Sequence, residues 1–167
     1  MRGCGGSIIS MKNYPSIVSR TDLVALRQGM HQQNQKVVFT NGCFDLLHRG
    51  HIECLREARQ LGDVLIVGLN SDASVRNLKG LDRPLIGQED RAVLLAALRS
   101  VTYVCIFDEV SVENLVGELV PDILVKGGDY RPEEIVGHEI VTGAGGQVRA
   151  LSLLPQFSTS LLIERIK

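Results

Sequence analysis

The chain has 167 residues and a mass of 18.3 kDa, which is the size of one ordinary domain and excludes a multidomain machine. Its formal net charge is −1, so it has no excess charge for general binding of polyanions. Hydrophobic residues make up 44% of the chain and aromatic residues only 4%, which is typical of a globular protein and argues against an aromatic platform for nucleic acid.

Residues 1–18 are expected to form a disordered leader, because the first ten contain too little apolar length for a secretory signal. The longest apolar runs, such as residues 64–69, have the length of a strand and fall far below the ~20 residues that cross a bilayer. Four irregularly spaced cysteines predict free thiols in a reduced cytoplasmic protein. We therefore expect a single domain over residues 19–167, in the cytoplasm.

The first predicted element is a helix over residues 21–33, with Leu23, Leu26 and Met30 on one face and Ser19 or Thr21 as its cap. Beyond it, apolar segments rich in β-branched residues alternate with helical patterns. Strands are predicted over residues 36–40, 63–69, 101–107, 123–126 and 147–153. Helices are predicted over residues 50–60, 88–99, 112–119, 132–142 and 159–166. Their inward faces are expected to include Ile52, Leu55, Ala58, Val93, Leu94 and Ala97.

This alternation predicts an α/β fold, a Rossmann-like doubly wound sheet of five parallel strands with helices on both faces. Ligands of such sheets bind beyond the carboxyl ends of the strands, where the strand order reverses. The residues that follow the strands are therefore candidates for a site. Four such clusters are polar, glycine-rich or cationic, namely residues 41–51, 70–72, 126–130 and 157–160.

The first cluster places His48 and His51 at the start of a helix that begins at about Gly50. Unpaired backbone N–H groups and the helix dipole favour an anion there, and both imidazoles can donate N–H bonds to phosphate oxygens. The absent side chain of Gly50 lets a ligand approach the backbone. No G-x-G-x-x-G follows the first strand and no G-x-x-x-x-G-K-[ST] occurs, which argues against redox and kinase-type sites.

Other interpretations of these residues remain open. Cys43, His48, His51 and Cys54 can be drawn as a zinc site, although their spacing does not follow the usual ligand pairs. His48 can equally be a surface loop residue, and His51 a helix-start residue that bonds a carbonyl. Cys54 is expected to pack in the core.

Residues 40–51, TNGCFDLLHRGH, resemble the H-x-G-H signature of the nucleotidyltransferase superfamily, which includes the cytidylyltransferases, pantetheine-phosphate adenylyltransferase and the class I aminoacyl-tRNA synthetases. The similarity continues through residues 69–72, 78–80 with 83–84, Arg91, 124–130 and 157–160. Within the superfamily the chain is most similar to the adenylyltransferases of the ADP-heptose pathway. Glycerol-phosphate cytidylyltransferases have an Arg-Thr-Glu-Gly-Ile run before the last helix that this sequence lacks, and Ser160 stands where the heptose group usually has threonine.

The resemblance implies transfer of AMP from ATP to D-glycero-D-manno-heptose 1-phosphate, which gives ADP-heptose and pyrophosphate for the lipopolysaccharide inner core. The sugar phosphate is already anionic, so the reaction needs alignment and charge neutralisation, with neither a general base nor an enzyme nucleophile. Mg²⁺ is the implied cofactor, bound mainly by substrate phosphates, and no metal ligands are assigned to the protein. The implied partners are ATP, a sugar 1-phosphate and a second copy in a homodimer, with no nucleic acid and no membrane.

The resemblance also assigns roles to individual residues, some of which have ordinary structural alternatives. The catalytic residues would be His48, His51 and Lys126. The nucleotide would be bound by Thr40, Asn41, Gly42, Phe44, Gly50, Asn70, Asp72, Arg91, Gly127, Asp129, Phe157, Ser158, Thr159 and Ser160. The sugar phosphate would be bound by Lys79, Arg83, Asp129 and Tyr130. The hydroxyls of residues 158–160 can instead serve as a plain helix cap, and Asp129 can form a turn after Gly128.

Two alternative functions remain. One is a cytidylyltransferase or guanylyltransferase that acts on another sugar or polyol phosphate. The other is a nucleotide-binding regulatory module without turnover, against which the intact His48, Gly50 and His51 argue.

Overall fold

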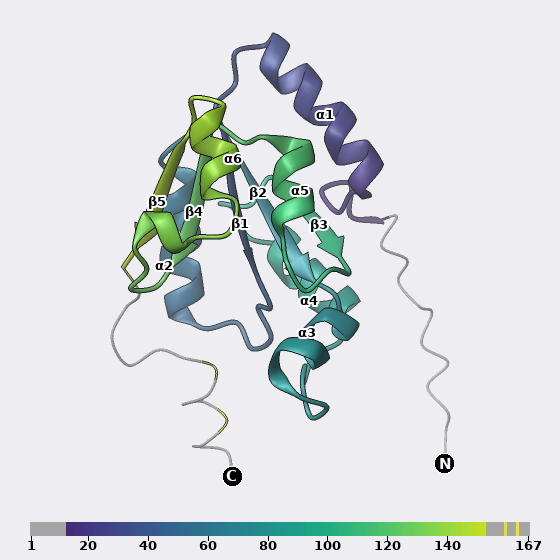
Figure 1. The fold of residues 1–167 in the computed structure, drawn as a ribbon. Helices are drawn as coiled ribbons and strands as arrows, with labels where there is room; N and C mark the ends of the chain where they lie inside the picture. The colour runs from purple at the N-terminus through teal and green to yellow at the C-terminus, as the bar shows by residue number, and fades with distance from the viewer. Residues whose placement is uncertain (1–12, 153–158, 160–162, 164–167) are drawn as a thin grey trace, which may run out of the picture.

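The computed structural model describes residues 13–152, 159 and 163, and its centre is a parallel sheet of five strands (Figure 1). The strands are β1 (Val37–Gly42), β2 (Val64–Asn70), β3 (Tyr103–Phe107), β4 (Ile123–Gly127) and β5 (Gln147–Leu151). Their order in the sheet is β3-β2-β1-β4-β5, and each neighbouring pair is parallel. The order reverses between β1 and β4, which confirms the predicted doubly wound fold.

Helices cover both faces of this sheet (Figure 1). On one face lie α1 (Arg20–Gln32), α5 (Glu113–Leu119) and α6 (His138–Gly143). On the other lie α2 (Arg49–Arg59) and α4 (Gln88–Ala96). Between β2 and α4 the chain forms the short helix α3 (Asp72–Lys79), at the carboxyl end of the sheet.

Two apolar clusters hold these layers together, one on each side of the sheet. Phe39 and Leu115 are fully or almost fully buried in the first cluster, and Leu55 and Leu95 in the second. Gly68 in β2 makes room for the first cluster, because a Cβ at this position would lie 2.7 Å from the ring of Phe39. The alternating contributions of β1 and β2 to both clusters explain why their sequences are almost continuously apolar.

The inward faces of two helices differ from those predicted. In α2 the buried stripe runs through Gly50, Leu55 and Ala58, and Ile52 lies outside it with 36% of its surface exposed. The stripe starts at Gly50 because a residue without a side chain can lie close against its neighbours.

In α4 the predicted inward residues Leu94 and Ala97 are exposed. The buried residues are Arg91, Ala92 and Leu95. Apolar spacing alone gave the wrong face, because one of the three buried residues of this helix is an arginine with polar partners, which hydrophobic periodicity does not reveal.

The helix predicted over residues 132–142 is broken in the structure. It consists of a 3-10 turn over Pro132–Glu134 and the separate helix α6, which begins at His138. Ile135 between them is buried, and Gly137 has a φ of 96°, which favours glycine and ends any continuous helix. The sequence analysis also missed α3, although Ser71 caps it by accepting a hydrogen bond from the N–H of Ser74 at 3.2 Å.

The described part of the expected leader pairs with the edge of the sheet. The N–H of Val18 donates to the carbonyl of Val104 at 3.0 Å, and the N–H of Val104 donates to the carbonyl of Ser16 at 2.8 Å. These bonds cover the outer edge of β3, so the folded part of the chain begins before residue 19. Within the described ranges, no helix has the length and apolar character needed to cross a membrane.

Candidate active site

A cavity of about 580 Å³ lies beyond the carboxyl ends of β1, β2 and β4, where the strand order reverses. Thr40 pairs with Val67 in β2 and with Val125 in β4, so the residues that follow these positions emerge side by side. This register brings together predicted site residues that are far apart in the sequence. Those that line the cavity are Thr40, Asn41, Gly42, Phe44, His51, Asn70, Lys79, Lys126, Gly127, Tyr130 and Thr159.

The two histidines of the H-x-G-H segment form a stacked pair. Their ring centroids are 3.8 Å apart with an angle of 22° between the planes. His48 occupies the cap position of α2, where its carbonyl accepts a hydrogen bond from the N–H of His51 at 3.0 Å. The ring of Phe44 lies against His51 from another side, with centroids 5.2 Å apart. His51 lines the cavity directly, and its Nδ1 has no hydrogen-bond partner among the described residues.

Burial keeps both imidazoles neutral at neutral pH. Desolvation lowers the pKa of His48 below its ordinary value of 6.5. The pKa of His51 falls to about 4, mainly through desolvation. The charge of His48, once acid protonates that ring, and the charge of Lys79 lower it further. Neutral rings still carry one N–H donor each, so the pair can donate hydrogen bonds to an anion without first taking up a proton.

The lowered pKa of His51 predicts a loss of stability in mild acid. The folded protein resists protonation of this ring, whereas the unfolded chain takes up the proton near pH 6.5. Stability should therefore fall as the pH decreases from about 6.5 toward 4, and His51→Asn should show a smaller fall. Urea unfolding at pH 7 and pH 5 measures the difference, with His31→Asn, a change at an exposed position, as the control. Equal losses in wild type and His51→Asn would contradict the prediction.

Lys126 joins the two strands that flank the reversal of strand order. Its Nζ donates to the backbone carbonyl of Asn41 at 3.1 Å and to the side-chain Oδ1 of Asn41 at 3.3 Å. Burial lowers the pKa of Lys126 below its usual value. Lys79 lines the same cavity from the end of α3. The cavity lining therefore includes lysines from two different elements, whose positive charges suit phosphate oxygens.

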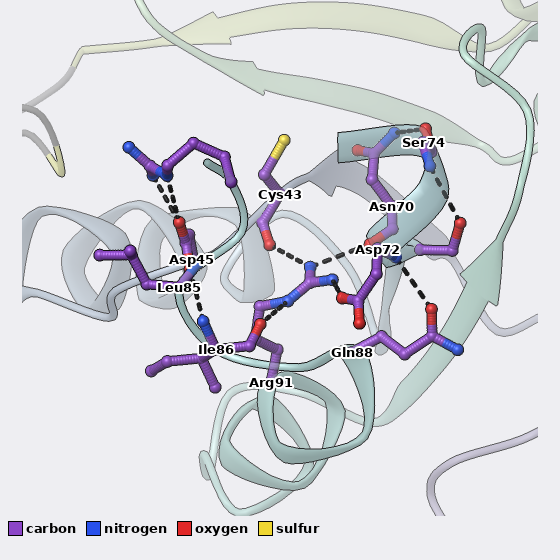
Figure 2. Close-up of polar contacts among 11 residues, drawn as sticks. Cys43, Asp45, Asn70, Asp72, Ser74, Leu85, Ile86, Gln88 and Arg91 are labelled. Carbon is purple, nitrogen blue, oxygen red and sulfur yellow. Dashed lines mark hydrogen bonds and ion pairs between the residues drawn. The ribbon is translucent and has the colours of Figure 1, made fainter. Parts of the chain in front are cut away.

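Arg91 does not line the cavity but is fully buried beside it, where it holds three segments together (Figure 2). Its Nε donates to the carbonyl of Ile86 at 2.9 Å, and its Nη1 donates to the carbonyls of Cys43 at 2.5 Å and Asn70 at 2.9 Å. Its Nη2 pairs with Asp72 at 2.7 Å. Arg91 therefore bonds to Asp72 and to three backbone carbonyls, and the expected contacts of Arg91 and Asp72 with nucleotide remain predictions.

Arg83 is likewise engaged by the protein. Its Nε donates to Oδ2 of the buried Asp45 at 2.6 Å, while Oδ1 of Asp45 accepts from the N–H groups of Leu85 at 2.8 Å and Ile86 at 3.0 Å (Figure 2). Asp45 therefore ties the loop after β1 to the loop before α4. Arg83 does not line the cavity in this structure, and its expected contact with the sugar phosphate remains a prediction.

The remaining predicted residues fall into two groups. Gly50 and Asp129 do not line the cavity, and Asp129 is exposed. Gly50 is buried in the first turn of α2, between the two histidines. Phe157, Ser158 and Ser160 lie outside the described residues, so their expected contacts with nucleotide remain predictions.

A group of five apolar lining residues, named here the apolar wall, was missed by the sequence analysis. Its residues follow β3 or β4 or end α3, and they are Leu78, Val110, Val112, Ile135 and Val136. Ser111, Glu134, Cys43, Cys54 and Leu55 complete the lining, together with Asp45. The loop after β3 could have been found from the rule that ligands bind at carboxyl ends of strands, because it follows the strand predicted over residues 101–107.

No metal site is formed by the described His, Cys, Asp and Glu side chains, since no three of them converge. This includes Cys43, His48, His51 and Cys54, so the alternative zinc site is not supported. Cys43, Cys54 and Cys105 are free thiols, as predicted. Cys54 packs partly against the second core cluster. Both oxygens of the Asp45 carboxylate accept hydrogen bonds from protein donors.

Comparison with known proteins assigns residues 39–165 to a family model described as Cytidylyltransferase-like. The Bifunctional protein HldE of Pelobacter propionicus is 51% identical over 150 residues, which are 90% of this chain and 31% of the relative. The HldE of Helicobacter pylori is 46% identical over 168 residues, which are 98% of this chain and 35% of the relative. The chain thus spans about a third of the length of these curated relatives.

Solved structures show the same fold. The crystal structure of the lipopolysaccharide core biosynthesis protein of Thermoplasma volcanium GSS1 has a TM-score of 0.58 and 28% identity, and the match covers 72% of this chain and 97% of that one. Pantoate-beta-alanine ligase of Francisella tularensis has a TM-score of 0.58 at 16% identity, with coverage of 84% and 67%, which is a similarity of fold alone.

Proposed function

Because the chain belongs to the cytidylyltransferase-like family, we propose that it is a nucleotidyltransferase that transfers AMP from ATP to D-glycero-D-manno-heptose 1-phosphate. The products are ADP-heptose and pyrophosphate, for the inner core of lipopolysaccharide. The extensive identity with HldE proteins and the similarity to a lipopolysaccharide core biosynthesis protein support this choice of pathway.

The observation that carries the proposal is the mixed chemistry of the cavity lining. His51, Lys79 and Lys126 line the cavity together with apolar residues that include Val110 and Val136. A nucleoside triphosphate combines the same two characters, with a charged triphosphate and a flat base. Cationic and N–H donors favour the phosphates, and apolar side chains favour the base.

In the proposed reaction an oxygen of the sugar 1-phosphate attacks the α-phosphorus of ATP, a new P–O bond forms, and the bond to the pyrophosphate breaks. No proton has to leave the attacking oxygen, so no residue acts as general base. His48 and His51 donate N–H bonds to the α-phosphate as negative charge builds on it, and the first turn of α2 adds its unpaired backbone N–H groups. Lys126, held by Asn41, neutralises a phosphate at the mouth of β1 and β4.

Mg²⁺ would enter with the nucleotide. It would keep several water molecules and take its other ligands mainly from phosphate oxygens. Bound in this way, it supplies neutralisation of phosphate charge. The chain's own residues bind and align the two anions.

The proposal is tested by measuring pyrophosphate release with Mg²⁺ and the separate α- and β-anomers of D-glycero-D-manno-heptose 1-phosphate, with ATP, CTP or GTP as donor. Release with ATP and one anomer is the expected result. Release with CTP or GTP alone would keep the reaction class and contradict the choice of base. Release with none of the three would contradict the proposed acceptor, and other sugar phosphates and polyol phosphates would then be screened.

A further inference from the structure

The N-terminal helix α1 lies outside the residues that match the family model, which begin at residue 39, yet it is connected to the wall of the cavity. It packs beside α5 and β3 (Figure 1). Arg20 is the first residue of α1 and points its guanidinium at two glutamates of the neighbouring segments. The proposed mechanism assigns no role to this arginine.

Arg20 holds these glutamates with short contacts on both sides of its guanidinium. Its Nη1 donates to Oε1 of Glu109 at 2.5 Å, and its Nε and Nη2 donate to the two carboxylate oxygens of Glu118 at 2.7 Å and 2.9 Å. The side chain of Arg20 is 30% exposed, and those of Glu109 and Glu118 are 33% and 48% exposed. The bidentate pair with Glu118 orients the guanidinium of Arg20. The remaining nitrogen, Nη1, is then available to donate to Glu109.

Glu109 belongs to the loop between β3 and α5, which forms part of the cavity. The next residues, Val110, Ser111 and Val112, all line it. Val110 has 54% of its surface exposed, so few neighbours hold this loop from the solvent side. The ion pair between Arg20 and Glu109 therefore fixes the chain at the position immediately before the lining residues.

A second contact continues from this loop to the floor of the cavity. The carbonyl of Glu109 accepts a hydrogen bond from Oγ of Ser74 at 2.8 Å, and the same Oγ accepts one from Nδ2 of Asn70 at 2.9 Å. Asn70 is buried at the end of β2 and lines the cavity. The series Arg20, Glu109, Ser74 and Asn70 thus connects the first turn of α1 with a residue at the floor.

We infer that Arg20 is a positioning residue for the binding site, which acts by fixing the 109–112 loop through Glu109. The inference rests on the proposed function, in which this cavity binds a nucleotide. In this inference α1 does more than pack against the sheet, because its Arg20 positions the 109–112 loop. No residue of α1 itself lines the cavity. The loop belongs to the apolar wall, so its displacement should weaken nucleotide binding and leave the chemical step at the histidines unchanged.

The test compares Arg20→Gln and Glu109→Gln with the matched control Glu118→Gln, which removes the negative charge of Glu118, keeps an oxygen that accepts from Arg20, and leaves the contact with Glu109 in place. Arg20→Gln and Glu109→Gln should each raise the KM for ATP by about fivefold with kcat unchanged, the size expected for the loss of a partly exposed ion pair. The double variant should show no further increase. Arg20→Lys should restore part of the affinity, because it keeps a charge that can reach Glu109.

Hydrogen–deuterium exchange gives a second readout that needs no substrate. Amides of residues 109–112 should exchange faster in Arg20→Gln and Glu109→Gln than in wild type and Glu118→Gln. Unchanged exchange and an unchanged KM in both variants would overturn the inference and leave Arg20 as a helix anchor. A wild type without ATP turnover would contradict the proposed function, and the exchange data would still decide the role of Arg20.

Discussion

Replacing His51 with alanine is expected to lower kcat by about 10²- to 10³-fold, the usual effect of removing one donor that stabilises developing negative charge. The affinity for ATP should change little, because Lys79, Lys126 and the apolar wall remain in place. The expected result follows from the position of His51, which lines the cavity at the first turn of α2 and is held there by the rings of His48 and Phe44.

Steady-state kinetics with ATP and the heptose phosphate measure kcat and KM, and calorimetric titration measures the affinity for ATP. His31→Ala is the matched control, because His31 is an exposed histidine near the end of α1, outside the cavity. A kcat of His51→Ala within threefold of wild type would remove this histidine from the catalytic role. A loss of affinity as large as the loss of kcat would assign it to ground-state binding.

Replacing Arg91 with methionine is expected to reduce the free energy of unfolding by about 3–5 kcal/mol, the range for breaking a buried ion pair by removing one partner. The change leaves Asp72 without its cation, and it leaves the carbonyls that Arg91 binds without their donor. These carbonyls belong to Cys43 and Asn70, at the carboxyl ends of β1 and β2, so the loss falls on the frame of the cavity (Figure 2).

Urea unfolding of Arg91→Met and of the control Arg99→Met measures this loss. Arg99 is exposed just beyond the end of α4, so its replacement should change the free energy of unfolding by less than about 0.5 kcal/mol. If Arg91→Met is as stable as wild type and fails to bind ATP, the arginine contacts nucleotide directly, as the resemblance implied. The structure instead predicts that the main effect of Arg91→Met is the loss of stability.

Asp45 forms a contact between two predicted site segments that sequence reasoning did not find. Residues 40–51 and residues 78–80 with 83–84 were assigned to the site, and members of both groups line the cavity. Arg83, however, meets Asp45 across a sequence separation of 38 residues. Such a pair forms only after the two loops fold against each other, and no local pattern indicates it.

The same limit applies to Arg91 and to the inward face of α4, which was predicted wrongly. A charged residue in a helical pattern is normally solvated, and only the convergence of Cys43, Asn70 and Asp72 around Arg91 makes its burial possible. The break before α6 depends on Gly137, where a Cβ would lie 2.8 Å from Val116. The φ of 96° at Gly137 depends on how the chain packs in the fold, and hydrophobic periodicity does not predict it.

By itself the sequence determined the α/β alternation, the five parallel strands and the location of the site, because these follow from apolar periodicity and from the rule that ligands bind where strand order reverses. It also located the histidine pair, whose spacing places both residues at one helix start. Only the tertiary structure decided which cationic side chains line the cavity and which form ion pairs inside the protein. The reason is physical: Lys79 and Lys126 line the cavity, whereas Arg83 and Arg91 meet carboxylates from distant segments, and partner choice across such distances is set by packing.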